Sequence, residues 1–203
     1  LNLDYRVAVQ RSRQIANRLS KGVSFLMRKN NIDVHMGEAK LIARDTIVVT
    51  DEEGKTNPLK SKHIVIATGA SAMLPPGWQV DGKHILTYLE AILQEKLPQS
   101  AVIIGAGAIG VEFATIWRSY GVEVTIVEML PRLVPLEDEE VSSELAKAFS
   151  KQGIKVLTGH RVEALEAQEE GVLVKVTSDE GEKSLQAEQA LVAIGFKPNS
   201  RNL

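Results

Sequence analysis

A glycine-rich turn between a short apolar strand and a helix constrains the fold of this chain more than any other feature. The motif GxGxxG spans residues 105–110 and directly follows the apolar run Ala101–Ile104. A helical stretch continues to Tyr120, and residues 123–127 form a second strand-like run. This order is typical of a βαβ unit in a doubly wound sheet. We therefore expect an α/β fold with a Rossmann-like domain.

Each glycine of the motif has a separate physical role. Gly105 permits the tight strand-to-helix turn, Gly107 lets a pyrophosphate approach the backbone, and Gly110 lets helix and strand pack closely. The helix N-terminus adds unpaired N–H groups and a positive dipole. The alternative is a purely structural glycine turn. The acid Glu128, at the end of the second strand, favours a dinucleotide site instead.

Glu128 is the residue expected to select the cofactor. Its carboxylate can accept hydrogen bonds from the adenosine ribose and would repel a 2′-phosphate. The next three residues, Met129–Pro131, carry no cation, and the nearest base along the chain is Arg132. The sequence therefore predicts NAD rather than NADP, unless Glu128 is merely a surface acid at a strand end.

A second acid, Glu112, lies two residues after the last glycine. It could act near a bound nucleotide, or it could simply interact favourably with the helix dipole. The residues alone leave both interpretations open.

Composition narrows the class of protein. The chain has 203 residues, 44% of them hydrophobic, and a net charge of −2. These values are typical of a soluble α/β protein and favour neither nucleic acid nor an anionic membrane as partner. No transmembrane run or signal peptide is evident, so a cytoplasmic location is the expectation. The chain starts at Leu1 and ends after a turn, which suggests a piece of a longer polypeptide.

The sequence gives little indication of a metal site or of a catalytic nucleophile. The sequence contains no cysteine, so disulfides, thiolate nucleophiles and cysteine metal sites are excluded from this chain. The four histidines (His35, His63, His84 and His160) are scattered without ligand spacing. We expect them at the surface or at strand ends, with no metal bound.

The N-terminal third predicts a helix and several strands. Residues 3–29 have helical apolar spacing and a basic face, which could contact nucleic acid or membrane but is more simply a solvated face. Short strands are expected within residues 34–50, with a turn at 51–54. The apolar run His63–Ala67 predicts a buried parallel strand.

The remaining elements continue the α/β pattern and then change to a meander. We expect a connection at 71–83, helices at 87–94 and 138–151, a strand at 154–157, antiparallel strands at 161–168, 171–178 and 183–188, and a last strand at 189–194. Asp138 is the expected N-cap of the second of these helices.

Four segments together give the chain a resemblance to a known family. They are His63–Ala70, Val102–Glu112, Gly121–Glu128 and Leu191–Asn199. In this order and spacing the chain resembles the flavin-dependent pyridine nucleotide–disulfide oxidoreductases, most of all their dihydrolipoyl dehydrogenase branch.

The resemblance implies a division of the chain by cofactor. Residues 1–72 would be the second half of an FAD-binding domain, 73–194 an NAD-binding domain with its lead-in, and 195–203 the return to the FAD domain. The implied FAD contacts are Ala39, Thr68, Gly69 and Ala70. The implied NAD contacts are Gly105, Ala106, Gly107, Ala108, Ile109, Gly110, Val111, Glu112, Glu128, Val162 and Gly195. Glu112 matches a family acid near the nicotinamide and flavin.

The resemblance also implies what the parent does and what this chain lacks. Electrons would pass from dihydrolipoamide through a disulfide and FAD to NAD, with the lipoyl domain of a 2-oxo acid dehydrogenase complex as partner. The FAD glycine motif, the redox CxxxxC, the FAD-closing aspartate and the C-terminal His/Glu pair of the family are absent from the sequence, as is the C-terminal domain expected to form a homodimer. The chain alone is therefore expected to be inactive. Alternatives are a mercuric reductase, an NADH oxidase, a soluble transhydrogenase or a non-catalytic NAD sensor.

Overall fold

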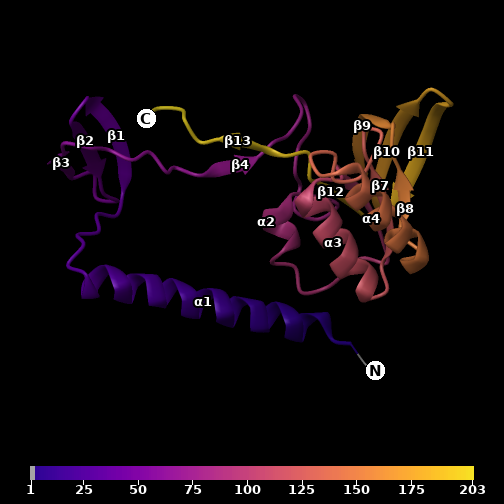
Figure 1. Ribbon diagram of the computed structural model, residues 1–203, viewed down its shortest axis with the longest axis horizontal. Helices are drawn as coiled ribbons and strands as arrows, with labels where there is room; N and C mark the ends of the chain where they lie inside the picture. The colour runs from indigo at the N-terminus through magenta and orange to yellow at the C-terminus, as the bar shows by residue number, and fades with distance from the viewer. Residues whose placement is uncertain (1–2) are drawn as a thin grey trace. The chain divides into compact units, whose positions relative to one another are not determined.

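The computed structural model describes residues 3–203, so the first two residues of the predicted 1–72 domain lie outside it. The chain forms two compact units (Figure 1). Unit 1 comprises residues 72–196 with residues 3–10, and unit 2 comprises residues 11–71 and 197–203. Each unit is described by itself.

A five-stranded parallel sheet forms the centre of unit 1. Its order is β5 (Ile85–Leu86), β12 (Gln189–Val192), β6 (Ser100–Ile104), β7 (Glu123–Val127) and β8 (Lys155–Leu157). Every neighbouring pair is parallel. Parallel strands are covered on both faces, which explains their continuous apolar runs. Although β12 is the last of these five strands in the chain, it lies inside the sheet between β5 and β6.

Helices cover one face of this sheet. The helices are α2 (Tyr88–Ala91), α3 (Ala108–Ser119) and α4 (Glu139–Gln152). Trp117 of α3 and Phe149 of α4 are buried in one cluster with Ile103 of β6. The predicted cap of α4 is confirmed, because Asp138 accepts a hydrogen bond from the Glu140 N–H at 2.8 Å. The helix ends at Gly153, in the left-handed conformation that glycine favours.

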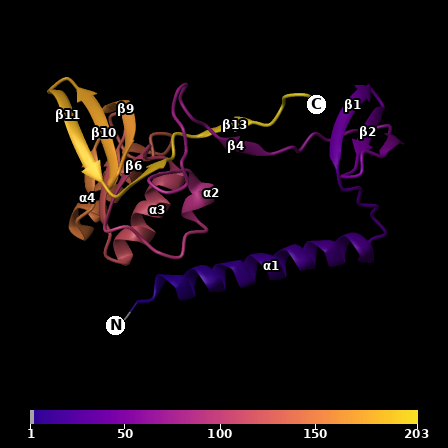
Figure 2. The same ribbon diagram turned by 180° about the vertical axis from the view of Figure 1, so that it is seen from behind.

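An antiparallel meander covers the other face of the sheet. Its strands are β9 (Arg161–Gln168), β10 (Gly171–Ser178) and β11 (Gly181–Ala187), in the order β11-β10-β9. Val102 and Ile104 of β6 pack with the meander residue Val174, whereas Ile103 packs with the helices. Figure 2 shows the meander and α3 from behind. The α/β class with parallel sheet and meander is confirmed.

Unit 2 contains most of a long helix and a small antiparallel sheet. The helix is α1 (Tyr5–Lys29), and the sheet has the order β1 (Glu38–Ala43), β2 (Thr46–Thr50) and β3 (Thr56–Lys60). The first two strands fall in the predicted region, whereas β3 was not predicted. Along α1, Val9 is buried but Leu19 is 64% exposed, so the apolar stripe is largely uncovered.

The prediction of a buried strand at His63–Ala67 is wrong. These residues form no strand, and the Val65 side chain is 88% exposed. A strand needs at least one ladder partner, and the sheet of unit 2 consists of β1, β2 and β3, none of which pairs with this segment. Apolar composition alone therefore overestimated its burial.

The chain passes between the units three times, first within α1 and then at two short strands. β4 (Ala70–Ala72) lies at the second passage and pairs with β13 (Phe196–Pro198) at the third. From residue 3 onward, no helix combines the length and apolar character needed to span a membrane.

Candidate functional site

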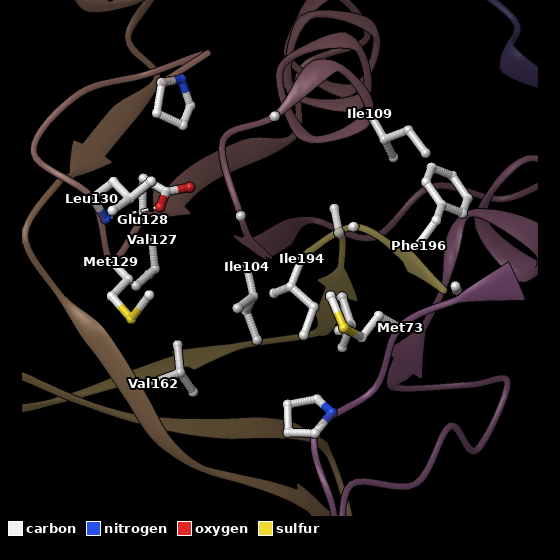
Figure 3. A pocket seen from close by; sticks show the side chains of 18 of the residues that line it. Met73, Ile104, Ile109, Val127, Glu128, Met129, Leu130, Val162, Ile194 and Phe196 are labelled. Carbon is white, nitrogen blue, oxygen red and sulfur yellow. Dashed lines mark hydrogen bonds between the residues drawn. The ribbon is translucent and has the colours of Figure 1, made fainter. Parts of the chain in front are cut away.

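The main pocket of unit 1 lies where the parallel strands end. Its volume is about 970 Å³, and its wall includes the strand ends Ile104, Val127 and Val192. Ligands of open α/β sheets bind at this carboxyl edge. Figure 3 shows an elongated site with Glu128, Met129 and Leu130 at one end, and Ile109, Phe196 and Met73 at the other.

The three motif glycines have different surroundings. A Cβ at Gly105 would overlap the Ala193 carbonyl, and a Cβ at Gly110 would overlap the Gly105 carbonyl. Gly105 also has φ +102°, a conformation that side chains disfavour. A Cβ at Gly107 would meet nothing within 4 Å, and this residue lines the pocket. Two glycines therefore shape the turn, and the third leaves space beside it.

The N-terminus of α3 opens onto this space. Its N-cap is Gly107, which has no side chain to accept hydrogen bonds from the first-turn N–H groups. Ala108 and Ile109 begin the helix and line the pocket. Free N–H groups and the helix dipole together suit a phosphate group.

Glu128 is a buried residue, which rules out the surface-acid alternative. It is 9% exposed and lines the pocket. One carboxylate oxygen accepts the Ala106 N–H at 2.7 Å, and the other accepts the Leu130 N–H at 2.8 Å. A carboxylate oxygen has more than one acceptor position, so both can still accept from a ligand hydroxyl. Glu128 also links the glycine turn to the loop after β7.

The cations near Glu128 differ from the sequence expectation. Arg132 does not line the pocket; its guanidinium donates to Glu139 at 2.6 Å and to the Pro135 carbonyl at 3.1 Å. Arg161, at the start of β9, does line the pocket. The sequence analysis considered the basic residue nearest to Glu128 along the chain. It did not predict Arg161, because only the fold brings β9 to this edge of the sheet.

The structure brings some of the predicted NAD contacts together and leaves others outside. Those lining the pocket are Gly105, Gly107, Ala108, Ile109, Glu128, Val162 and Gly195. Ala106, within the turn, and Gly110, in α3, are buried and do not line the pocket. Val111 and the exposed Glu112 border a separate, smaller hollow between α3 and α4.

Sequence reasoning missed much of the apolar wall. The residues it missed include Met73, Trp78, Tyr88, Met129, Leu130, Leu136 and Phe196. Two signals were available, because Met129 and Leu130 directly follow Glu128 and Phe196 directly follows Gly195. Met73 and Trp78 come from the predicted connection at 71–83, which has no motif, and Tyr88 is the first residue of α2.

The predicted FAD contacts lie in two parts of the chain. The Thr68 hydroxyl donates to the Asn199 carbonyl at 2.6 Å, and the Asn199 N–H donates to the Gly69 carbonyl at 3.0 Å. Ala70 begins β4. Ala39 lies on β1, paired with Val49 of β2. The segment 68–70 is thus held against Asn199, while Ala39 belongs to the antiparallel sheet.

The histidines offer no shared ligand geometry. His160 is buried at a strand end, with its Nδ1 2.8 Å from the Thr158 carbonyl oxygen. Within residues 3–203, no group of three or more His, Asp or Glu side chains is arranged to hold a metal ion.

Comparison with known proteins identifies the family. The profile described as pyridine nucleotide-disulphide oxidoreductase matches residues 3–203. The chain belongs to this family. The resemblance seen in the sequence is thereby confirmed, together with the fold class that it implied.

Several dihydrolipoyl dehydrogenases are close relatives within the pyridine nucleotide-disulphide oxidoreductases. That of Mycobacterium leprae is 45% identical over 201 residues, covering 98% of this chain and 43% of the relative. That of Zymomonas mobilis is 40% identical over 203 residues, covering 100% of this chain and 44% of the relative. The chain thus spans less than half the length of these curated relatives.

Solved structures of this family share the fold. LpdA from Mycobacterium tuberculosis superposes with a TM-score of 0.90 at 26% identity, covering 100% of this chain and 45% of that chain. The HOCl-induced flavoprotein disulfide reductase RclA from Escherichia coli gives a TM-score of 0.82 at 28% identity, covering 99% and 45%.

Proposed function

We propose that unit 1 is the NAD(H)-binding part of a flavin-dependent oxidoreductase and that its main pocket takes the dinucleotide. The observation that carries this proposal is the buried Glu128 carboxylate, held at the pocket wall by the N–H groups of Ala106 and Leu130. An acid at this position is suited to the adenosine ribose hydroxyls.

The glycine turn supplies the proposed phosphate contacts. Pyrophosphate would accept hydrogen bonds at the N-terminus of α3, where Gly107 leaves open space and Ala108 and Ile109 line the pocket. Gly105 and Gly110 would allow the conformation of the turn, and Val162 and Gly195 would line the nucleotide site. Val111 and Glu112 lie at the neighbouring hollow. For Glu112 we retain a role near nicotinamide and flavin in the whole protein.

NAD is the proposed cofactor rather than NADP. A 2′-phosphate beside Glu128 would face like-charge repulsion. Arg132 is occupied by Glu139 and backbone carbonyls, which leaves Arg161 as the pocket-lining cation that could compensate. Comparing the affinities for NADH and NADPH therefore tests the proposed preference for NAD directly.

Unit 2 is proposed to be part of an FAD-binding domain. Thr68, Gly69 and Ala70 would approach the flavin nucleotide with their backbone, and Ala39 is a further candidate. The proposed domain limits remain 1–72, 73–194 and 195–203. Support comes from membership of a family whose relatives include a flavoprotein disulfide reductase.

For the whole protein we propose dihydrolipoyl dehydrogenase activity, on the strength of 40–45% identity to enzymes of that name. Bound FAD would supply the electron-carrying chemistry between a disulfide and NAD, while the chain binds and orients the nucleotide. A lipoyl domain as partner, a homodimer and a cytoplasmic location belong to the same proposal. A related disulfide reductase is the second candidate, favoured by the likeness to RclA.

The cofactor proposal is tested by calorimetric titration of the full chain. We expect NADH to bind in the micromolar-to-millimolar range and more tightly than NADPH, and no flavin to remain after purification. Equal affinity for the two cofactors would refute the role of Glu128. A yellow, stoichiometric flavoprotein would refute the domain limits.

The activity proposal is tested with a chimera. The matching segment of the mycobacterial dihydrolipoyl dehydrogenase is replaced by this chain, and oxidation of dihydrolipoamide by NAD⁺ is measured. We expect an active chimera, and an inactive one when it carries Gly107→Val. A chimera that binds FAD and NADH but leaves dihydrolipoamide unoxidised would contradict the proposal.

A further inference from the structure

An aromatic pair stands at the end of the pocket remote from Glu128. Phe196 and Tyr88 both line the pocket, with ring centroids 5.6 Å apart and planes inclined by 63°. Phe196 is 47% exposed, although it is a large apolar residue inside a cavity wall. Figure 3 shows Phe196 beside Ile109 and Met73, with Ile104 and Ile194 between this end and Glu128. Part of its ring is thus free for a ligand.

Tyr88 provides a firm base for the Phe196 ring. It is the first residue of α2, whose capping box joins Thr87 and Glu90: the Glu90 carboxylate accepts from the Thr87 N–H at 2.8 Å and from its hydroxyl at 2.6 Å. The Tyr88 side chain also packs against the buried cluster of α3 and α4. The position of Tyr88 is therefore set by both capping and core packing.

The backbone beside Phe196 is held as well. The Met73 N–H donates to the Gly195 carbonyl at 2.9 Å, which ties the segment before Phe196 to the adjacent segment at Met73. Phe196 is therefore an exposed aromatic ring on a restrained support. Such rings bind flat aromatic ligands at low entropic cost, because little freedom remains to be lost.

We propose that the Phe196–Tyr88 pair is a stacking platform for the nicotinamide ring, an inference that rests on the proposed NAD(H) site. Glu128 would take the adenosine ribose at one end, and the α3 N-terminus would take the pyrophosphate between the ends. The second base of the dinucleotide then reaches the Phe196 end. Phe196 stacks on one face of the nicotinamide, and the other face stays free to exchange hydride with a second cofactor.

The test compares two ligands that differ only in the base at this end. NADH and ADP-ribose share the adenosine, the pyrophosphate and a second ribose, but ADP-ribose lacks nicotinamide. For Phe196→Ala in the full chain, calorimetry should give an NADH affinity lowered about three- to tenfold. The ADP-ribose affinity should stay unchanged, and Phe196→Tyr, which keeps the ring, should bind NADH like the wild type.

A matched control is Phe25→Ala, which removes a similarly exposed ring (57%) from α1 in unit 2 and should change neither affinity. Equal losses of NADH and ADP-ribose in Phe196→Ala would overturn the platform, as would an unchanged NADH affinity. Equal binding of both ligands by the wild type would overturn it too, while leaving the proposed nucleotide site intact. Failure of the wild type to bind either ligand would overturn both proposals.

Discussion

The glycines of the GxGxxG motif separate into two physical kinds. Gly105 and Gly110 have backbone carbonyls where a Cβ would stand, whereas Gly107 faces open pocket. A side chain at either of the first two would force the backbone to shift, and we propose that the third glycine leaves room for a ligand to approach. A substitution series can therefore separate binding from folding within one turn.

We expect Gly107→Val to abolish NADH binding with little change in stability, because the branched side chain would fill the space for the pyrophosphate. Gly110→Val should instead destabilise the protein by at least about 1–3 kcal/mol, since it forces the Gly105 carbonyl to move. Urea unfolding and NADH titration measure the two effects. Unfolding of Gly107→Val would support a structural role for this glycine.

Glu128→Ala should weaken NADH binding about 10- to 100-fold, as expected for losing a charged hydrogen-bond acceptor. NADPH binding should change little or improve, because the repulsion of the 2′-phosphate disappears. The variant should also lose about 1–3 kcal/mol of stability, since the buried Ala106 N–H loses its partner. Parallel titrations and urea unfolding check this, with Glu128→Gln as the isosteric control. NADH affinity unaffected by Glu128→Ala would exclude the ribose contact.

The segment from β5 to α2 depends on two carboxylates. Burial raises the pKa of Asp81, but the N–H groups of Ile85, Lys83 and His84 outweigh this and hold the pKa below its usual value. Burial likewise raises the pKa of Glu90, and the hydroxyl and N–H of Thr87 more than reverse it. Both carboxylates thus stabilise the folded segment in their charged form.

A pKa lowered by folding contributes stability that is present above the unfolded pKa and lost as the pH falls through the folded pKa. We therefore expect the segment to loosen below about pH 4. Near-ultraviolet circular dichroism, to which the Tyr88–Phe196 pair contributes, should change in this pH range. The double variant Asp81→Asn/Glu90→Gln should show a weaker acid dependence, and an unchanged one would contradict the assignment.

Elements with local signals were predictable from the sequence, and those that depend on distant partners were not. Helix α4 is marked by Asp138 at its start and Gly153 at its end, so its limits could be read directly. The run His63–Ala67 has strand composition, but a ladder partner cannot be read from composition. Phe196 and Arg161 join the pocket only through the order of the sheet and meander, which no local pattern encodes.

The hydrophobic core of the whole molecule is unevenly distributed. Both buried clusters lie within unit 1, on the two faces of its parallel sheet. Unit 2 instead exposes apolar side chains such as Phe25, Val65 and Ile66. Burial of apolar surface is the dominant favourable term in folding, so the two units should differ strongly in autonomous stability.

We expect residues 72–196 expressed alone to unfold cooperatively and to bind NADH with the affinity of the full chain. Residues 11–71 alone should show no cooperative transition, because they contain neither buried cluster. Thermal circular dichroism and calorimetric titration measure both. A molten 72–196 segment would show that its core needs the rest of the chain.

The position of β12 inside the sheet, rather than at its edge, has a consequence for synthesis on the ribosome. This strand is inserted between β5 and β6, and the Ala193 carbonyl that follows it confines Gly105, yet it is among the last parts of unit 1 to be translated. A nascent chain can form the first βα unit early, but it must wait for residues 189–193 to complete the sheet. We expect nascent chains to bind NADH only after residues 189–193 have been translated. NADH binding by chains stalled before Gln189 would contradict this order.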